Sequence, residues 1–195
     1  MLKENTMKII FIRHGQGEHT LSPPESLQMS DATLTEKGVQ QAQQLKQTFP
    51  LTNKNIIIIS PTRRTIETAL IWAKEISCTL YVHPLVSPRM FPLLAPDQAY
   101  ACDHILHYTK IKTDYPSLHN IESSEEIWTN GINTISEEAF HRVAKAFTIW
   151  CKQLNQHTLY IVSHDGTINA YRSFLGESVT RDHFLDESGS YIVHL

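Results

Sequence analysis

Two histidines and two or three arginines of this chain follow apolar runs, where they could hold and accept a phosphoryl group. Residues 13–15 read Arg-His-Gly after the run MKIIFI, and His164 comes one serine after the run TLYIV. A third run, NIIII, is followed by Ser-Pro-Thr-Arg-Arg at residues 60–64. A neutral imidazole can attack phosphorus near neutral pH, and the planar guanidinium of arginine binds two phosphate oxygens at once. These residue types are therefore candidates for phosphoryl transfer through a histidine nucleophile.

Neighbouring strands would bring these side chains together. The apolar runs at residues 7–13, 55–59 and 158–162 predict strands that are covered on both faces. The carboxyl ends of parallel strands lie at one edge of a sheet, where α/β folds place their ligands. A further short strand is predicted at 79–82, and a last strand, antiparallel to its neighbour, at 190–194.

The stretches between these runs carry helical signals. Ser60 and Pro61 suit the cap and the first position of a helix, while Ser123 and Thr134 each begin a capping-box pattern. We predict helices at residues 35–49, 60–76, 123–131, 134–154 and 166–175. Strands that alternate with helices predict an α/β fold, a three-layer α/β/α sandwich with a mostly parallel central sheet and one antiparallel edge strand.

The length and composition suit one domain. The chain has 195 residues, of which 41% are hydrophobic, which is enough for a sizeable core. We expect residues 1–195 to form a single domain, with residues 1–6 as a disordered leader. Residues 83–120 contain five prolines and predict an insertion that selects the substrate, with a short helix near 97–109.

Charge and cysteine content limit the classes of partner and compartment. The net charge is −3 and no long basic run occurs, so neither nucleic acid nor an anionic membrane is an expected partner. The three cysteines are odd in number and form no CxxC pair, which argues against a disulfide framework and a thiolate zinc site. Because we find no signal-peptide pattern and no membrane-length apolar run, we expect a cytoplasmic protein.

Four segments, in order, resemble the histidine phosphatase superfamily, which has the phosphoglycerate-mutase-like fold. RHGQG stands at residues 13–17, LTEKGVQQA at 34–42, SPTRRTIETA at 60–69 and SHDG at 163–166. RHG alone is a weak match, but the four segments together span most of the chain at spacings that the superfamily uses. The resemblance therefore implies the fold of that superfamily and a phosphohistidine chemistry.

The resemblance also implies roles for individual residues. His14 looks like the nucleophile that carries the phosphoryl group, and Arg13 and Arg64 look like phosphate clamps. His164 looks like the fourth member of the phosphate pocket, a charged donor to a phosphate oxygen. Arg64 rather than Arg63 falls on the second arginine of the superfamily, so Arg63 is expected to face solvent or a carboxylate.

The acid that protonates the leaving group is the main departure from the superfamily pattern. Superfamily members usually have a carboxylate soon after the third strand, but residues 83–91 contain none. Asp103 is the first candidate for this general acid and Asp97 is the second.

Three further residues are candidates for substrate binding. Gln16 extends the RHG segment, and Thr20 stands where the superfamily often has an asparagine that helps to hold phosphate. A threonine hydroxyl can donate one hydrogen bond, although with a shorter reach than an amide. Arg89 could add a positive charge for a substrate with a second anionic group.

The predicted function is hydrolysis of a small phosphorylated molecule by a histidine acid-type phosphatase. A mutase or phosphotransferase that passes the group to another acceptor is the first alternative, and a non-catalytic phospho-ligand-binding module is the second. No cofactor is expected. No metal is expected either, because the HxxH pair His104 and His107 has no third ligand at a convincing spacing. The oligomeric state stays open.

Overall fold

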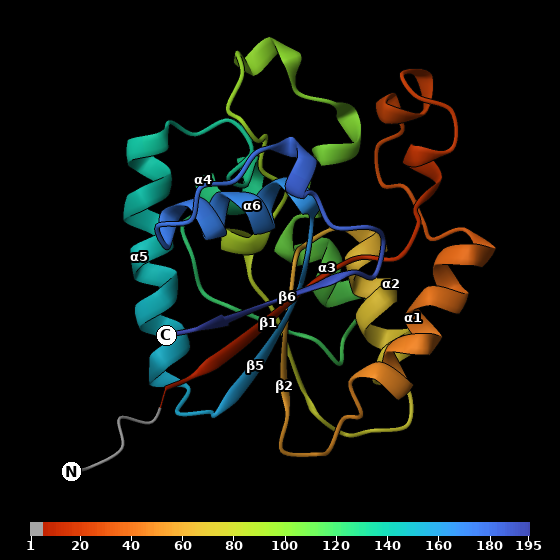
Figure 1. Ribbon diagram of the computed structural model, residues 1–195. Helices are drawn as coiled ribbons and strands as arrows, with labels where there is room; N and C mark the ends of the chain where they lie inside the picture. Colours follow the sequence, from red (N-terminus) through yellow and green to blue (C-terminus); the bar gives the residue numbers. More distant parts are fainter. Residues whose placement is uncertain (1–5) are drawn as a thin grey trace.

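A mixed six-stranded sheet forms the middle layer of the protein (Figure 1). The computed structural model describes residues 6–195, so residues 1–5 of the predicted leader lie outside the described residues. The strand order is β4-β3-β2-β5-β1-β6, in which only the β1–β6 pairing is antiparallel. The strands are β1 (Lys8–Arg13), β2 (Ile56–Ile59), β3 (Thr79–Val82), β4 (His119–Asn120), β5 (Thr158–Ser163) and β6 (Ser190–His194). The predicted fold class is confirmed.

Helices cover both faces of this sheet, as Figure 1 shows. One face packs against α5 (Glu137–Gln153) and α6 (Asp165–Phe174). The other packs against α1 (Glu36–Thr48), α2 (Arg63–Trp72), α3 (Tyr108–Asp114) and α4 (Glu125–Asn130). Residues along a strand alternate between the two faces. In β1, Ile9 and Phe11 therefore join the first core, whereas Ile10 and Ile12 join the second.

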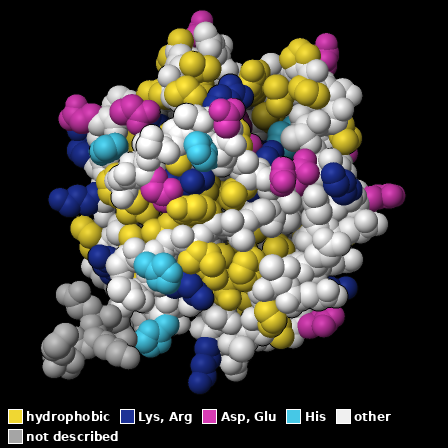
Figure 2. All heavy atoms as spheres, in the orientation of Figure 1, with side chains coloured by type: hydrophobic (Ala, Val, Ile, Leu, Met, Phe, Trp, Pro, Cys, Tyr) yellow, Lys and Arg dark blue, Asp and Glu magenta, His cyan; other side chains and the backbone are white. Residues whose placement is uncertain are grey.

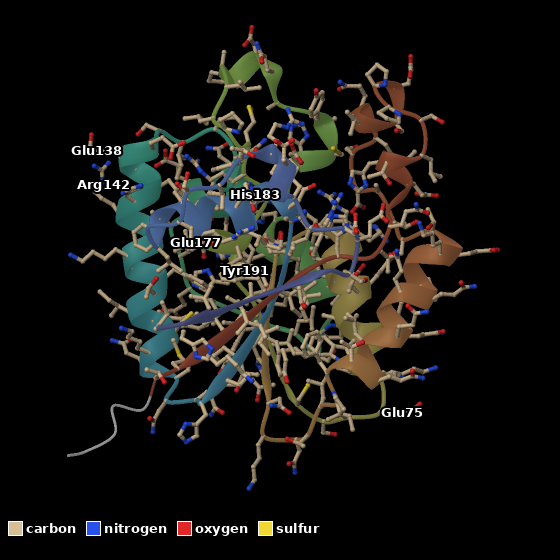
Figure 3. The ribbon with its side chains drawn as sticks, in the orientation of Figure 1. Glu75, Glu138, Arg142, Glu177, His183 and Tyr191 are labelled. Atoms are coloured by element: carbon tan, nitrogen blue, oxygen red, sulfur yellow. The ribbon has the colours of Figure 1, made fainter. Side chains whose placement is uncertain are left out.

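Charged and polar side chains fix the outer parts of these layers (Figure 3). Glu138 and Arg142 pair one helical turn apart on the solvent side of α5. The hydroxyl of Tyr191 in β6 donates to Glu177 in the segment after α6, and the guanidinium of Arg172 lies 4.0 Å from the Tyr191 ring centroid. The antiparallel edge strand is thereby tied to α6.

Helix α2 begins later than the sequence predicts. Ser60 was expected to cap it and Pro61 to occupy its first position, but the helix starts at Arg63 with Thr62 as the N-cap residue. The side chain of Ser60 instead contacts His164, 104 residues away along the chain. The predicted role of Ser60 as a helix cap is therefore wrong, because this tertiary contact occupies its hydroxyl group.

The predicted insertion, residues 83–120, is only partly irregular. In place of a helix at 97–109 there are short 3₁₀ turns at Pro96–Gln98 and Ala101–Asp103, and α3 starts at Tyr108. The backbone N–H of Leu106 donates to Pro61, so a tertiary contact holds this stretch extended before α3. The last part of the predicted insertion contributes α3 to one core and β4 to the sheet.

The capping-box patterns locate two helices within two residues of their true starts. The caps are Ser124 rather than Ser123 for α4, and Ser136 rather than Thr134 for α5. Each hydroxyl accepts a hydrogen bond from the backbone N–H three residues later, which satisfies a free donor of the first turn. Gly131 ends α4 with φ of 64°, a conformation that favours glycine.

Candidate active site

His14 follows β1 at the carboxyl edge of the sheet and is almost fully buried, with 2% exposure. Its Nδ1 lies 2.6 Å from the carbonyl oxygen of Gly15. A carbonyl oxygen can only accept a hydrogen bond, so Nδ1 carries the ring proton and Nε2 keeps its lone pair. His14 therefore presents an unprotonated nitrogen, the form that attack on phosphorus requires.

The surroundings of His14 keep its ring neutral. Burial lowers the pKa of His14 well below its ordinary value, and the positive charge of Arg64 lowers it further. The ring is consequently available as a nucleophile at neutral pH without a separate base to deprotonate it.

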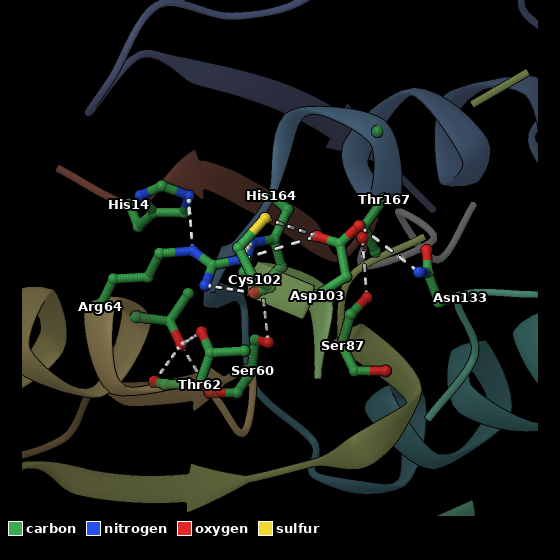
Figure 4. A network of polar contacts seen from close by, with 12 residues as sticks. His14, Ser60, Thr62, Arg64, Ser87, Cys102, Asp103, Asn133, His164 and Thr167 are labelled. Carbon is green, nitrogen blue, oxygen red and sulfur yellow. Dashed lines mark hydrogen bonds and ion pairs between the residues drawn. The ribbon is translucent and has the colours of Figure 1, made fainter. Parts of the chain in front are cut away.

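Arg64 lies in the first turn of α2 and joins the two histidines of the site (Figure 4). Its Nε donates to Nε2 of His14 at 3.2 Å, and its Nη2 lies 3.2 Å from Nδ1 of His164. Its Nη1 donates to the carbonyl oxygen of Cys102 at 2.8 Å. Three contacts thus fix the plane of a guanidinium group that is itself buried.

His164 caps the start of α6 and is neutral. The guanidinium of Arg64 can only donate, so Nδ1 of His164 is an acceptor, and the ring proton lies on Nε2, 2.7 Å from the Ser60 hydroxyl oxygen. Burial lowers the pKa of His164 well below its ordinary value, and Arg64 adds to this effect. The prediction of a charged His164 is therefore wrong for this arrangement.

Arg13 and Arg63 each pair with a carboxylate. Nη2 of Arg13, at the end of β1, lies 3.2 Å from Oδ2 of Asp165, and its Nη1 donates to the carbonyl oxygen of Leu185. Arg63 pairs with Asp31 at 2.5 Å, which agrees with its predicted carboxylate partner. Arg13 is thus oriented by Asp165 and Leu185, while Arg63 is engaged outside the cavity.

The site has one open cavity of about 290 Å³. The surface in Figure 2 is hollowed near the top of the view, between two lobes of apolar side chains. Arg13, His14, Arg64 and His164 all line the cavity. The structure therefore brings together the four residues that the strand-end argument selected from distant parts of the sequence.

Asp103 also lines the cavity, whereas Asp97 does not and is exposed. Oδ1 of Asp103 lies 3.9 Å from Nη2 of Arg64, and its Oδ2 accepts a hydrogen bond from Asn133 at 3.4 Å. Burial raises the pKa of Asp103, although Arg64 acts in the opposite direction. A carboxyl group with a raised pKa, next to the site, can hold a proton for a leaving oxygen.

The polar groups of Thr20 and Gln16 are engaged within the loop that follows β1. Thr20 lines the cavity, but its hydroxyl donates to the carbonyl oxygen of Gly17 at 2.9 Å. Gln16 does not line the cavity, and its Oε1 accepts a hydrogen bond from Thr35 at 2.9 Å. Gln16 is therefore not placed to bind substrate, because its amide oxygen holds the start of α1.

Arg89 lines the cavity, and its guanidinium group is held by the segment before α5. Its guanidinium donates to the carbonyl oxygens of Ile132 and Ile135, lies 3.2 Å from Glu137 and stacks 4.3 Å from the Phe140 ring centroid. Only 1% of its side chain is exposed. The role of Arg89 in substrate binding stays a prediction, and the structure shows its charge serving the connection before α5.

Two residues at the cavity were missed as site residues. His19 lies in the turn after the RHG segment, and Asp165 begins α6 beside Arg13. The signal for His19 was its position one residue before Thr20. The signal for Asp165 was its place in the SHDG segment, which was used to recognise the superfamily and not to assign a role.

Comparison with known families supports the same reading of these segments. A family model described as the histidine phosphatase superfamily (branch 1) matches residues 9–92. The resemblance to the histidine phosphatase superfamily is confirmed. The stretch matched to this superfamily includes three of the four segments, and the SHDG segment lies beyond it. No curated protein matches the sequence.

Solved structures of phosphatases share the fold. A mycobacterial glucosyl-3-phosphoglycerate phosphatase has a TM-score of 0.62 at 15% identity, over 97% of this chain and 90% of its own. A phosphoserine phosphatase from Entamoeba histolytica has a TM-score of 0.59 at 22% identity, over 95% and 89%. The alpha-ribazole phosphatase from Shigella flexneri has a TM-score of 0.60 at 16% identity, also over 95% and 89%. At these identities the likeness concerns the fold.

Two further searches of the described residues bear on metals and membranes. Residues 6–195 contain no cluster of three or more histidine, cysteine, aspartate or glutamate side chains placed to hold a metal ion. His107 instead contacts Glu125 at 3.0 Å. Within the same residues, every helix is too short or too polar to span a membrane.

Proposed function

We propose that this protein hydrolyses phosphomonoesters through a phosphohistidine intermediate on His14. The observation that carries the proposal is the arrangement around Arg64, which contacts the unprotonated Nε2 of His14 and Nδ1 of His164 at 3.2 Å each. The fold shared with phosphatases and the family match support it. The proposed natural substrate is a small phosphorylated molecule, and the proposal goes no further than this class.

In the first step, the N–H of Arg64 turns from Nε2 of His14 to a phosphate oxygen. The freed Nε2 lone pair attacks phosphorus, and the bond between phosphorus and the ester oxygen breaks. The equatorial oxygens gain charge as the transition state forms, and Arg13 and Arg64 donate to them. His164 joins them once the phosphate charge has favoured a proton on its Nδ1. Asp103 gives its proton to the departing oxygen, which leaves as an alcohol.

In the second step, water attacks the phosphoryl group on His14. Asp103, now a carboxylate, accepts a proton from that water, and the bond between phosphorus and Nε2 breaks. Inorganic phosphate leaves, and both His14 and Asp103 return to their starting protonation states. No net proton is lost from the site over the two steps.

Phosphate release from p-nitrophenyl phosphate tests the proposal, with wild type and His14→Ala compared between about pH 5 and pH 8. We expect release by the wild type and loss of about three orders of magnitude or more in His14→Ala, because the nucleophile is gone. Equal activity of the two proteins would overturn the assignment of His14. Phosphate binding without turnover would instead favour a binding module.

Incubation with 3-phosphoglycerate separates hydrolysis from transfer within the molecule. We expect phosphate release if this compound is a substrate. Isomerisation without phosphate release would replace the hydrolase proposal with a mutase.

A further inference from the structure

His19 is the third imidazole at the cavity, and the proposed mechanism does not use it. It lies in the 3₁₀ turn Glu18–Thr20 and is buried, with 6% exposure. Its ring centroid is 5.4 Å from that of His14, and it lines the cavity together with Arg13, Arg64 and His164. A buried imidazole at this position requires either a structural partner or a ligand.

The neighbouring Thr20 cannot easily supply the donor that the superfamily places at its position. Its hydroxyl proton is used by the carbonyl oxygen of Gly17, at 2.9 Å. The turn is held in place on its other side, because the hydroxyl of Ser26 donates to the carbonyl oxygen of His19 at 2.7 Å. The loop therefore directs the ring of His19, and not the hydroxyl of Thr20, toward the phosphate pocket.

The surroundings of the His19 ring indicate which of its nitrogens carries the proton. Nδ1 is buried and has no hydrogen-bond partner among residues 6–195. The ring rests against the bare Cα of Gly17, where an added Cβ would lie 2.6 Å from Nδ1. A proton on Nδ1 would be a buried donor without an acceptor, which is costly. The neutral ring is therefore best satisfied with its proton on Nε2.

We propose that His19 binds the phosphoryl group, with Nε2–H donating to a non-bridging oxygen in place of the missing asparagine amide. This inference rests on the proposed function, because it assigns a further ligand to the same phosphate site. It makes Gly17 part of the site as well, since a side chain there would displace the ring.

The electrostatics of the site keep the His19 ring neutral. Burial, followed by the positive charges of Arg64 and Arg13, lowers the pKa of His19 to about 3. The ring is therefore expected to bind phosphate as a neutral donor through Nε2–H, without taking up a second proton on the buried Nδ1.

Calorimetric titration with inorganic phosphate tests the inference with three variants. His19→Phe keeps a planar ring without a donor, and His19→Gln places an amide donor near the position of Nε2. His194→Phe is the matched control, because His194 pairs with Lys8 at the opposite end of β6 and β1 from the site.

We expect His19→Phe to raise the Kd for phosphate about tenfold or more, the usual effect of losing a hydrogen bond to a charged group. His19→Gln should recover most of the affinity, and His194→Phe should bind as the wild type does. The proton uptake on phosphate binding, measured in buffers with different ionisation enthalpies, should be the same in His19→Gln as in the wild type. If folded His19→Phe binds phosphate within a factor of about two of wild type, the inference is wrong.

A second measurement decides the matter even if His19→Phe does not fold. In protein labelled with ¹⁵N-histidine, the Nε2 signal of His19, identified by its absence in His19→Gln, should shift when phosphate saturates the site. An unchanged signal would overturn the inference. Phosphate binding without hydrolysis of p-nitrophenyl phosphate by wild type would overturn the proposed hydrolase activity but would leave this assignment standing.

Discussion

At the scale of single residues, one guanidinium group organises the site. Arg64 donates to an acceptor nitrogen on each of two histidines, and both rings are neutral because burial and this positive charge lower their pKa values. The sequence was sufficient to predict that His14, Arg64 and His164 meet, because all three follow buried strands. It was not sufficient to predict the protonation state of His164, which depends on burial and on its contact with Ser60.

The general acid provides the first residue-scale prediction. Asp103→Asn should lower kcat/KM for an alkyl phosphate by about 100-fold or more, because an alkoxide leaves poorly without a proton. The loss should be much smaller for p-nitrophenyl phosphate, whose leaving group needs no acid. Asp97→Asn is the control, because Asp97 is exposed and outside the cavity. Equal losses on the two substrates would remove Asp103 from this role and leave Asp165 as the remaining carboxyl group of the cavity.

The pH profile follows from the direction of the same pKa shift. The acid acts only while it is protonated, and burial raises the pKa of Asp103. Activity on alkyl phosphates should therefore persist to higher pH than an ordinary aspartate would allow, and should fall as the pH rises through that pKa. This descending limb should be absent from the profile of Asp103→Asn. Its persistence there would assign it to another group.

At the scale of elements, the start of α1 is pressed against the loop that carries His14. A Cβ added at Gly38 would lie 2.1 Å from the carbonyl oxygen of Gln16, and one added at Gly15 would lie 2.5 Å from the carbonyl oxygen of Gly38. The two backbones can approach this closely only because both positions are glycine. The helix therefore sets the position of the loop, and the loop sets the position of the nucleophile.

Gly38→Ala tests this contact between elements. We expect a loss of about 1–3 kcal/mol in the free energy of unfolding, because a methyl group must displace backbone atoms. We also expect a lower kcat for p-nitrophenyl phosphate, because the loop with His14 moves. Gln40→Ala, two residues away on the exposed side of α1, is the control in both denaturant unfolding and kinetics. If Gly38→Ala matches this control in both, α1 does not position the loop.

The wall of the cavity provides a second prediction at this scale. The wall of the cavity includes several apolar side chains, among them Leu27, Met90, Phe91, Leu94, Tyr100 and Phe184. We expect kcat/KM for 1-naphthyl phosphate to exceed that for 3-phosphoglycerate by about tenfold or more, because the aryl group buries apolar surface here. Kinetics with the two compounds at one pH measure this ratio. A preference for 3-phosphoglycerate would show that the wall does not select the leaving group.

Elements that depend on the sequence of their own segment were predictable, and elements that depend on contacts with distant residues were not. Five of the six strands and the long helices follow from apolar periodicity, and their starts and ends were predicted within a few residues, whereas the two-residue strand β4 was not predicted. The segment at 97–109 was not, because its shape depends on a hydrogen bond from Leu106 to Pro61. The partners of Arg89 were not predictable for the same reason, since they are carbonyl groups more than 40 residues further along the chain.

At the scale of the whole molecule, the sheet separates two cores, and a buried histidine packs into one of them. His83 follows β3 and packs between Phe147 and Trp150, with ring centroids 5.0 and 4.8 Å away. Burial lowers its pKa to about 3. At pH values between about 3 and the ordinary pKa of histidine, His83 binds a proton in the unfolded chain but not in the folded chain. The contribution of His83 to stability is therefore present at neutral pH and is lost as the pH falls.

His83→Asn tests this linkage, because asparagine can accept the hydrogen bond from Leu85 but does not titrate. The slope of unfolding free energy against pH, below about pH 6, should be smaller than in wild type by up to roughly 1.4 kcal/mol per pH unit. His157→Asn replaces an exposed histidine and serves as the control. Equal slopes for His83→Asn and wild type would mean that His83 is not held neutral. The variant is compared by slope because the substitution also changes core packing.

The central claim is that His14 is phosphorylated during turnover, and rapid quenching with ³²P-labelled substrate tests it most directly. The account predicts a protein-bound phosphoryl group that is labile to acid and stable to alkali, forms at a rate sufficient for turnover, and maps to the peptide containing His14. It also predicts that His14→Ala forms none. A phosphoryl group on another residue, or hydrolysis that continues in His14→Ala, would contradict the account.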